Sequence, residues 1–188
     1  MLASASPRRR ELLAAAGFDV TILPAQVQEI EGGISPRDLV MKNAERKAIA
    51  VAANLHGELV LGADTIVVLE GEILGKPRDM RHAAEMLERL GGRIHEVLTG
   101  VCLLRGGSTA RCTFVESTRV AFRPLKEADI LAYLAEVDPL DKAGSYAAQE
   151  DRGRLIEWIE GSMENVVGLP VACVITAIKT HFTEPSAG

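Results

Sequence analysis

The chain has 188 residues, 47% of them hydrophobic and 25% charged, and its formal net charge is −5. This is the composition of a globular protein that buries a core, and it excludes intrinsic disorder. A broad nucleic-acid groove needs the opposite sign of charge, so the composition disfavours nucleic acid as a partner.

The first half of the chain predicts two helices and three strands. Ser-Pro pairs at 6–7 and 35–36 place a capping residue before a proline, which is typical of a helix start. Apolar spacing and breaker residues set the other bounds. In chain order we expect a helix from Pro7 to Gly17, a strand over 18–23, a helix from Pro36 to about Asn54, a strand over 59–69 and a return strand ending near Leu74.

The second half predicts further alternation, with a hairpin turn at Gly106-Gly107. We expect a helix from Asp79 to Gly91, strands over 95–104 and 109–122, a helix over 127–137, a strand over 155–159 and a helix over 169–182. Alternating helices and strands with hairpins between them predict an α/β fold with a mixed β-sheet and flanking helices. The length favours one domain over residues 1–188.

The cysteine and histidine pattern limits the kinds of site. Three cysteines without a CxxC spacing disfavour a disulfide scaffold and a thiolate zinc site, and the four histidines form no HxxxH pair. Any metal is therefore expected to be hard and oxygen-ligated. No apolar run reaches the ~18 residues of a membrane span, and the charge order at the N-terminus does not fit a signal peptide. We expect a cytoplasmic protein with no membrane partner.

Two segments carry the strongest chemical signals. If Ser6 caps the first helix, the amides and guanidiniums of Arg8 and Arg9 make an anion site suited to phosphate; the alternative is a solvated helix start. Asp64 lies inside an otherwise apolar strand, where a carboxylate must be paired, hydrogen-bonded, protonated or metal-bound. It is either a metal ligand or base, or a structural residue satisfied by backbone amides.

Three further charged residues are ambiguous when taken alone. Lys76 is bracketed by Gly75 and Pro77, and Lys47 lies at the edge of the apolar stripe of the second helix, with Asn43 one turn before it on the same side. For both lysines the alternative is a solvated side chain. Glu29, in a glycine-adjacent loop, has the oxygens to ligate a cation or is simply solvated.

A polar loop follows the predicted helix over 127–137. It contains Asp141-Lys142-Ala143-Gly144-Ser145-Tyr146 and then Gln149. Gly144 permits a sharp turn, and Gln149 offers the donor and acceptor that a base edge needs. The alternative is an ordinary polar surface loop.

Taken together, these segments resemble the Maf family of nucleotide pyrophosphatases along nearly the whole chain. The resemblance rests on six segments in order, which are ASASPRR (3–9), GADT (62–65), GKP (75–77), GRIHEV with TGV (92–101), DKAGSY (141–146) and NVVGLP (165–170). It implies an α/β fold related to the inosine-triphosphate pyrophosphatases, with two lobes around a cleft, and a homodimer. It also implies hydrolysis of nucleoside triphosphates to monophosphate and pyrophosphate with a divalent metal, Mg²⁺ or Mn²⁺.

The resemblance also implies roles for individual residues. Phosphate binding falls to Ser6, Arg8 and Arg9, and catalytic roles fall to Lys47, Asp64 and Lys76. The metal would be held by Glu29 and Asp64.

Asp64-Thr65 with Lys142 and Gln149 is similar to the dTTP/UTP branch rather than the 7-methyl-GTP branch. We expect Thr65, Lys142 and Gln149 to bind the substrate. The family has glycine directly after this glutamine, whereas here residues 150–152 precede Gly153.

The implied mechanism is attack of water on the α-phosphorus. Asp64 would activate or orient that water, directly or through the metal, while the cations stabilise the leaving pyrophosphate. One alternative is a nucleotide-binding regulator of septum formation and cell division with incidental hydrolysis. Another is a nucleotidyltransferase, although the sequence has no motif for a second substrate.

Overall fold

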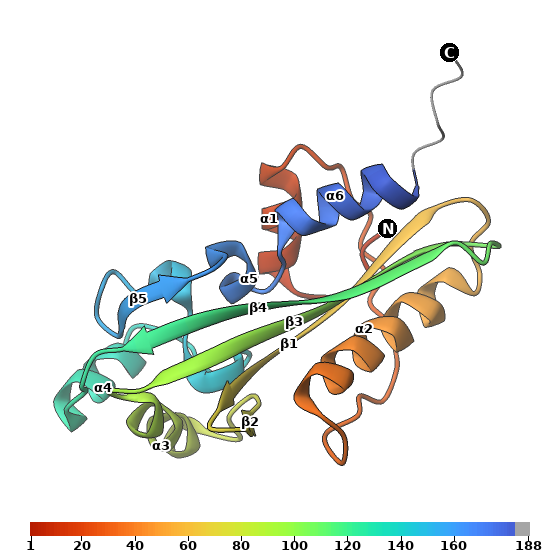
Figure 1. Ribbon diagram of the computed structural model, residues 1–188. Helices are drawn as coiled ribbons and strands as arrows, with labels where there is room; N and C mark the ends of the chain where they lie inside the picture. The colour runs from red at the N-terminus through yellow and green to blue at the C-terminus, as the bar shows by residue number, and fades with distance from the viewer. Residues whose placement is uncertain (183–188) are drawn as a thin grey trace. The chain divides into compact units, whose positions relative to one another are not determined.

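The computed structural model describes residues 1–182. Their helices and strands alternate along the chain (Figure 1). In order they are α1 (Pro7–Ala15), α2 (Pro36–Ala52), β1 (Leu59–Leu69), β2 (Glu72–Leu74), α3 (Met80–Leu90), β3 (Ile94–Arg105), β4 (Arg111–Phe122), α4 (Glu127–Leu134), the 3₁₀ turns η1 (Ala143–Ser145) and η2 (Ala148–Glu150), β5 (Ile156–Glu160), α5 (Met163–Val167) and α6 (Val171–His181).

The strands form one sheet in the order β2-β1-β3-β4-β5. β1 pairs antiparallel with β2, and β4 pairs antiparallel with β5. Two isolated bridges, which join Leu2 to Ile22 and to Leu61, are parallel. The predicted α/β class, with a sheet and flanking helices, is confirmed.

Most predicted elements are found within a few residues, and one prediction is wrong. The strand expected over 18–23 is reduced to the bridge at Ile22, because this stretch meets only the short N-terminal segment at Leu2. The helix expected over 169–182 begins at Val171, after Pro170, and the short helix α5 precedes it. Proline is tolerated before or at the first turn of a helix but not inside it, which explains the later start.

The chain forms two compact units. Unit 1 comprises Met1–Asp64, Thr99–Glu116 and the chain from Gly168 onward; unit 2 comprises Thr65–Leu98 and Ser117–Val167. The chain passes from one unit to the other within strands β1, β3 and β4. The assignment of residues 1–188 to one domain stays a prediction.

Helices cover both faces of the unit 1 strands (Figure 1). Leu61 and Ala63 of β1 pack with Leu13 of α1 and Val174 of α6, whereas Val60 packs with alanines of α2. Successive side chains of a strand point to opposite faces, so β1 is buried on both.

Two glycines let α2 approach the sheet closely. A Cβ atom on Gly62 would lie 2.2 Å from the carbonyl oxygen of Ala44, and one on Gly100 would lie 2.3 Å from that of Val40. Both distances are far below van der Waals contact, so a side chain here would force the helix away. The glycines therefore set the helix-to-strand distance on which the site in unit 1 depends.

Unit 2 has its own core. Buried side chains of β1, β3 and β4 pack against α3, α4 and the loop after α4. This cluster includes Val67, Val97 and Phe122 from the strands, Leu87 and Tyr133 from the helices, and Tyr146 from the loop. α3 contacts both α4 and the turn η1. Within residues 1–182, no helix combines the length and apolar character needed to cross a membrane.

Candidate active site

Strand alternation places Asp64 on the α2 face of β1. Val60 and Gly62 face α2, so Asp64, two residues further on, projects the same way. Asp64 is 7% exposed, and its carboxylate accepts hydrogen bonds from two side chains of α2. Lys47 Nζ lies 2.8 Å from Oδ1 and Asn43 Nδ2 lies 3.1 Å from Oδ2. The buried carboxylate is thus paired and hydrogen-bonded, as a buried charge must be.

Lys47 joins two carboxylates. Its ammonium lies 2.7 Å from Glu29 Oε1 and 2.8 Å from Asp64 Oδ1. The Lys47 side chain is 12% exposed, whereas that of Glu29 is 51% exposed. Lys47 is therefore not the solvated lysine of the alternative interpretation. It is the cation between one buried carboxylate and one that reaches solvent.

Asn43 fastens the Glu29 loop to this cluster. Its Oδ1 accepts from the Ile30 amide at 2.8 Å, and its Nδ2 donates to the Ile30 carbonyl at 3.0 Å as well as to Asp64. The side chain is 2% exposed. No role was predicted for Asn43, although its spacing of four from Lys47 on one helix was a signal that the two side chains act together.

Arg9 is held by two groups that the predicted site did not include. Its Nε donates to the Gly168 carbonyl at 2.9 Å, and its Nη1 donates to Ser4 Oγ at 3.0 Å. Burial lowers the pKa of Arg9, and the nearby carboxylate of Asp64 opposes that shift. Arginine keeps its charge even so, so Arg9 adds a buried positive charge within electrostatic reach of Asp64.

Ser6 takes the predicted N-cap position, but its side chain does not cap. It precedes Pro7 with extended backbone angles, and its hydroxyl makes no capping hydrogen bond. Its amide instead donates to Ser4 Oγ at 3.2 Å. Ser35, by contrast, caps α2 by accepting from the Asp38 amide at 3.1 Å. Arg8, half-buried, follows Pro7 in the first turn of α1.

The other predicted residues belong to unit 2. Thr65 is half-buried, and strand alternation turns it to the face opposite Asp64. Lys76 is exposed, directly after β2, and Gln149 is exposed within η2.

Lys142 is buried and directed at its own loop. Its ammonium donates to the Asp138 carbonyl at 2.6 Å and to Asp141 Oδ1 at 2.7 Å. These contacts hold together the loop that carries Gln149.

The acidic residues of the described chain limit the kind of metal site. Among residues 1–182, no group of three or more His, Cys, Asp or Glu side chains is arranged to hold a metal ion. Glu29 and Asp64, joined through Lys47, are a pair of carboxylates. Such a pair fits an ion that shares its oxygen ligands with a bound phosphate.

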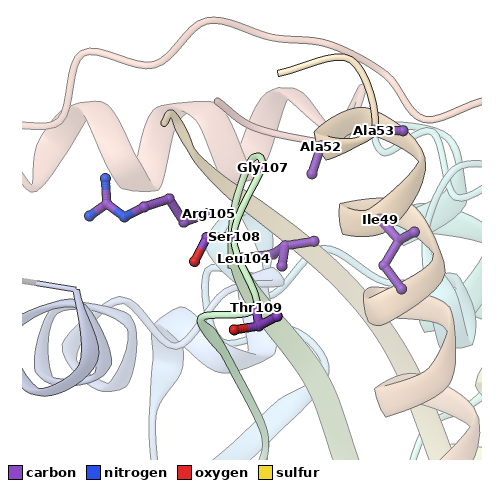
Figure 2. A pocket seen from close by; sticks show the side chains of 8 residues that line it. All are labelled: Ile49, Ala52, Ala53, Leu104, Arg105, Gly107, Ser108 and Thr109. Carbon is purple, nitrogen blue, oxygen red and sulfur yellow. The ribbon is translucent and has the colours of Figure 1, made fainter. Parts of the chain in front are cut away.

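A shallow hollow elsewhere in unit 1 has different chemistry. It lies between the end of α2 and the β3–β4 turn, and Ile49, Leu104 and Arg105 are among the residues that line it (Figure 2). Arg105 donates to the carbonyls of Gly57 and Phe182, at 2.8 and 2.9 Å. The hollow includes none of the predicted site residues and no carboxylate.

Comparison with known proteins covers nearly the whole chain. A family model described as Maf-like protein matches residues 1–181. The dTTP/UTP pyrophosphatase of Pyrococcus abyssi (strain GE5 / Orsay) is 43% identical over 182 residues, which are 97% of this chain and 96% of that protein. The protein of the same name from Bacillus anthracis (strain CDC 684 / NRRL 3495) is 47% identical over 180 residues, 95% of this chain and 93% of that protein.

Proposed function

The chain belongs to the Maf-like protein family, and on that premise we propose that it is a nucleoside triphosphate pyrophosphatase acting on dTTP and UTP. The products are the nucleoside monophosphate and pyrophosphate. The names of the relatives support the substrate. The observation that carries the chemistry is the buried Asp64 carboxylate, held by Lys47 and Asn43 beside Glu29.

Four basic residues are assigned to the triphosphate. Near neutral pH a nucleoside triphosphate carries about four negative charges, and its hydrolysis is accelerated mainly by positioning and charge stabilisation. Arg8 and Arg9 supply guanidiniums for phosphate oxygens, and Lys47 and Lys76 supply ammonium groups. The hydrogen bonds from Arg9 to Gly168 and Ser4 fix its side chain before substrate arrives.

Asp64 is assigned to the attacking water. The water oxygen forms a bond to the α-phosphorus, the bond from that phosphorus to the bridging oxygen breaks, and pyrophosphate leaves. Asp64 orients the water and accepts its proton, while Asn43 and Lys47 hold the carboxylate in one orientation. A sensor that only binds nucleotide needs the basic residues but not this carboxylate.

Glu29 and Asp64 are the residues that would hold a divalent cation. Their oxygens suit Mg²⁺ and Mn²⁺, and magnesium at phosphate sites is usually bound by one or two carboxylates plus phosphates and water. The pair already shares one positive charge, the Lys47 ammonium, which supports an arrangement built around a cation. When bound, such an ion neutralises charge on the phosphate oxygens.

Base recognition is assigned to Gln149 and Thr65, whose neutral groups can donate and accept hydrogen bonds. Lys142 acts on the substrate through the loop that it braces. A pocket that hydrogen-bonds one base edge leaves its groups unpaired when another base enters, which discriminates strongly.

The experiment is a panel of UTP, dTTP, CTP, GTP and ATP with Mg²⁺ or Mn²⁺, with products separated by ion-exchange chromatography. We expect UMP and pyrophosphate from UTP, and faster turnover of UTP and dTTP than of the purine nucleotides. Release of UDP and inorganic phosphate would place the attack at the γ-phosphorus and contradict the proposal.

A further inference from the structure

Four consecutive residues of unit 2 are each tied to a different part of that unit. The contacts are Gly144 N to the Gly75 carbonyl (3.1 Å), Ser145 Oγ to Met86 Sδ in α3 (3.1 Å), the Tyr146 hydroxyl to His95 Nε2 in β3 (2.9 Å) and Ala147 N to the Tyr133 hydroxyl in α4 (2.9 Å). We call residues 144–147 the anchored segment. All four residues are buried.

The backbone of the anchored segment occupies an unusual conformation. Gly144 and Ser145 both have positive φ, at 69° and 66°. A Cβ atom on Gly144 would lie 2.9 Å from Val67 Cγ2, so only glycine fits there. A serine in the left-handed region persists only where its surroundings fix it. The side-chain and backbone contacts of residues 144–147 supply that constraint.

His95 makes the most specific of these contacts. Its ring is 1% exposed and packs edge-to-face against Phe122 and Tyr146, with centroid distances of 5.0 and 5.5 Å. Burial lowers the pKa of His95 to about 4, so the ring is neutral near pH 7. Its Nδ1 has no hydrogen-bond partner among the described residues. The Tyr146 hydroxyl is therefore the polar partner of this ring.

The anchored segment lies between residues assigned to the substrate. Gln149 follows Tyr146 by three residues, and the Gly75 carbonyl that accepts from Gly144 directly precedes Lys76. Only two residues separate Tyr146 from Gln149, so the place of Tyr146 limits where Gln149 can lie.

We propose that the His95–Tyr146 hydrogen bond is a positioning device for base selectivity, which holds the anchored segment so that Gln149 meets a pyrimidine edge. The inference rests on the proposed function, because it takes Gln149 as the base reader. His95 and Tyr146 are positioning residues and do not touch the substrate. Their side chains act through the backbone of residues 144–149.

The test measures the affinities of UMP and GMP by calorimetry, since monophosphate binding reports base selectivity without hydrolysis. Tyr146→Phe removes one hydroxyl and keeps the ring that packs on Phe122. We expect it to lower the ratio of UMP to GMP affinity roughly 2- to 10-fold, as expected for losing one neutral hydrogen bond. Competition by inorganic pyrophosphate should change less than this ratio, because Arg8, Arg9 and Lys47, three of the four residues assigned to phosphate, lie in unit 1.

Two controls separate positioning from loss of stability. Ile130→Val removes one methyl group from the same core, in α4 and outside the anchored segment, and should lower the melting temperature. His95→Phe combined with Tyr146→Phe should reduce the UMP-to-GMP ratio no more than either change alone, since both remove one interaction.

The inference is overturned if Tyr146→Phe leaves the ratio of UMP to GMP affinity unchanged, or if Ile130→Val lowers that ratio as much as Tyr146→Phe does. It is also overturned if the unmutated protein binds UMP and GMP equally. Failure of the proposed function is a separate result, recognised by the absence of pyrophosphate release from UTP.

Discussion

Asp64 and Tyr146 are both buried, but Asp64 in unit 1 has a charged hydrogen-bond partner and Tyr146 in unit 2 has a neutral one. In unit 1, Asp64 is held by a lysine and an amide, with Glu29 on the same lysine and Arg9 within electrostatic reach. In unit 2, Tyr146 is held by a neutral histidine, and burial raises the pKa of its hydroxyl, which stays protonated. Charged partners suit phosphate chemistry and its developing charge, whereas neutral hydrogen bonds suit discrimination between bases.

The largest effect should follow the loss of the charge at Asp64. Asp64→Asn is close to isosteric and keeps the hydrogen bond from Asn43. We expect kcat on UTP to fall by roughly two to four orders of magnitude, the range for losing a general base. Asp19→Asn, which changes an exposed carboxylate of unit 1, is the matched control. Near-normal turnover in Asp64→Asn would make this carboxylate structural.

The packing that creates the charged site can be broken at one glycine. Gly62→Ala pushes a methyl group into the backbone of α2, so we expect a loss of about 3 kcal/mol in the free energy of unfolding, at the upper end for overpacking. Turnover should fall too, because Asn43 and Lys47 move away from Asp64. Gly32→Ala, with open space around its Cβ, should change stability by no more than about 1 kcal/mol. Urea titration of both variants checks the contrast; equal stabilities would contradict it.

The neutral state of His95 makes unit 2 sensitive to acid. The pKa of His95 is about 4 in the folded protein, below its ordinary value of 6.5, because burial disfavours the charged ring. The contribution of neutral His95 to the free energy of unfolding is fully present above pH 6.5. It falls as the pH drops toward 4, since in this range only the unfolded chain takes up the proton. The loss reaches about 3 kcal/mol at most.

The rings that face His95, those of Phe122 and Tyr146, carry no charge in this range. Urea unfolding at pH 7 and pH 4.5 should therefore show a smaller pH dependence in His95→Phe than in the unmutated protein. Identical dependence in the two proteins would mean that folding leaves the pKa of His95 unchanged.

A smaller effect should follow the loss of the Asn43 side-chain amide in unit 1. Asn43→Ala leaves the Ile30 backbone and one oxygen of Asp64 without their partner. We expect kcat to fall about 10- to 100-fold, the range for groups that orient a ligating carboxylate, with little change in KM. Lys42→Ala, exposed on the same helix, is the control. A rise in KM with kcat unchanged would assign Asn43 to substrate binding instead.

The helices and strands that could be predicted from the sequence are those whose bounds are set by nearby residues. The apolar, β-branched run over 59–69 gives β1 its bounds, and Asp79 caps α3 by accepting from the His82 amide at 2.8 Å. The stretch over 18–23 has similar residues but a short partner, so its pattern alone does not make a strand.

The parts of the site that escaped prediction depend on tertiary contacts. The role of Asn43 arises from the close approach of α2 to β1, which two glycines permit. Ser4 and Gly168 meet Arg9 from 5 and 159 residues away in the chain. Lys142 is directed at its own loop because the turn after Asp138 brings two acceptors to its ammonium. The spacing of residues along the sequence does not predict any of these contacts.

The separate roles proposed for Arg8 in phosphate binding and Gln149 in base recognition are tested most directly by comparing Arg8→Ala with Gln149→Ala. The measurement is the ratio of kcat/KM on UTP to kcat/KM on GTP. We expect Arg8→Ala to lower both values alike and keep the ratio, because phosphate is common to both substrates, and Gln149→Ala to lower the ratio. A ratio that changes in Arg8→Ala and stays constant in Gln149→Ala would contradict the account.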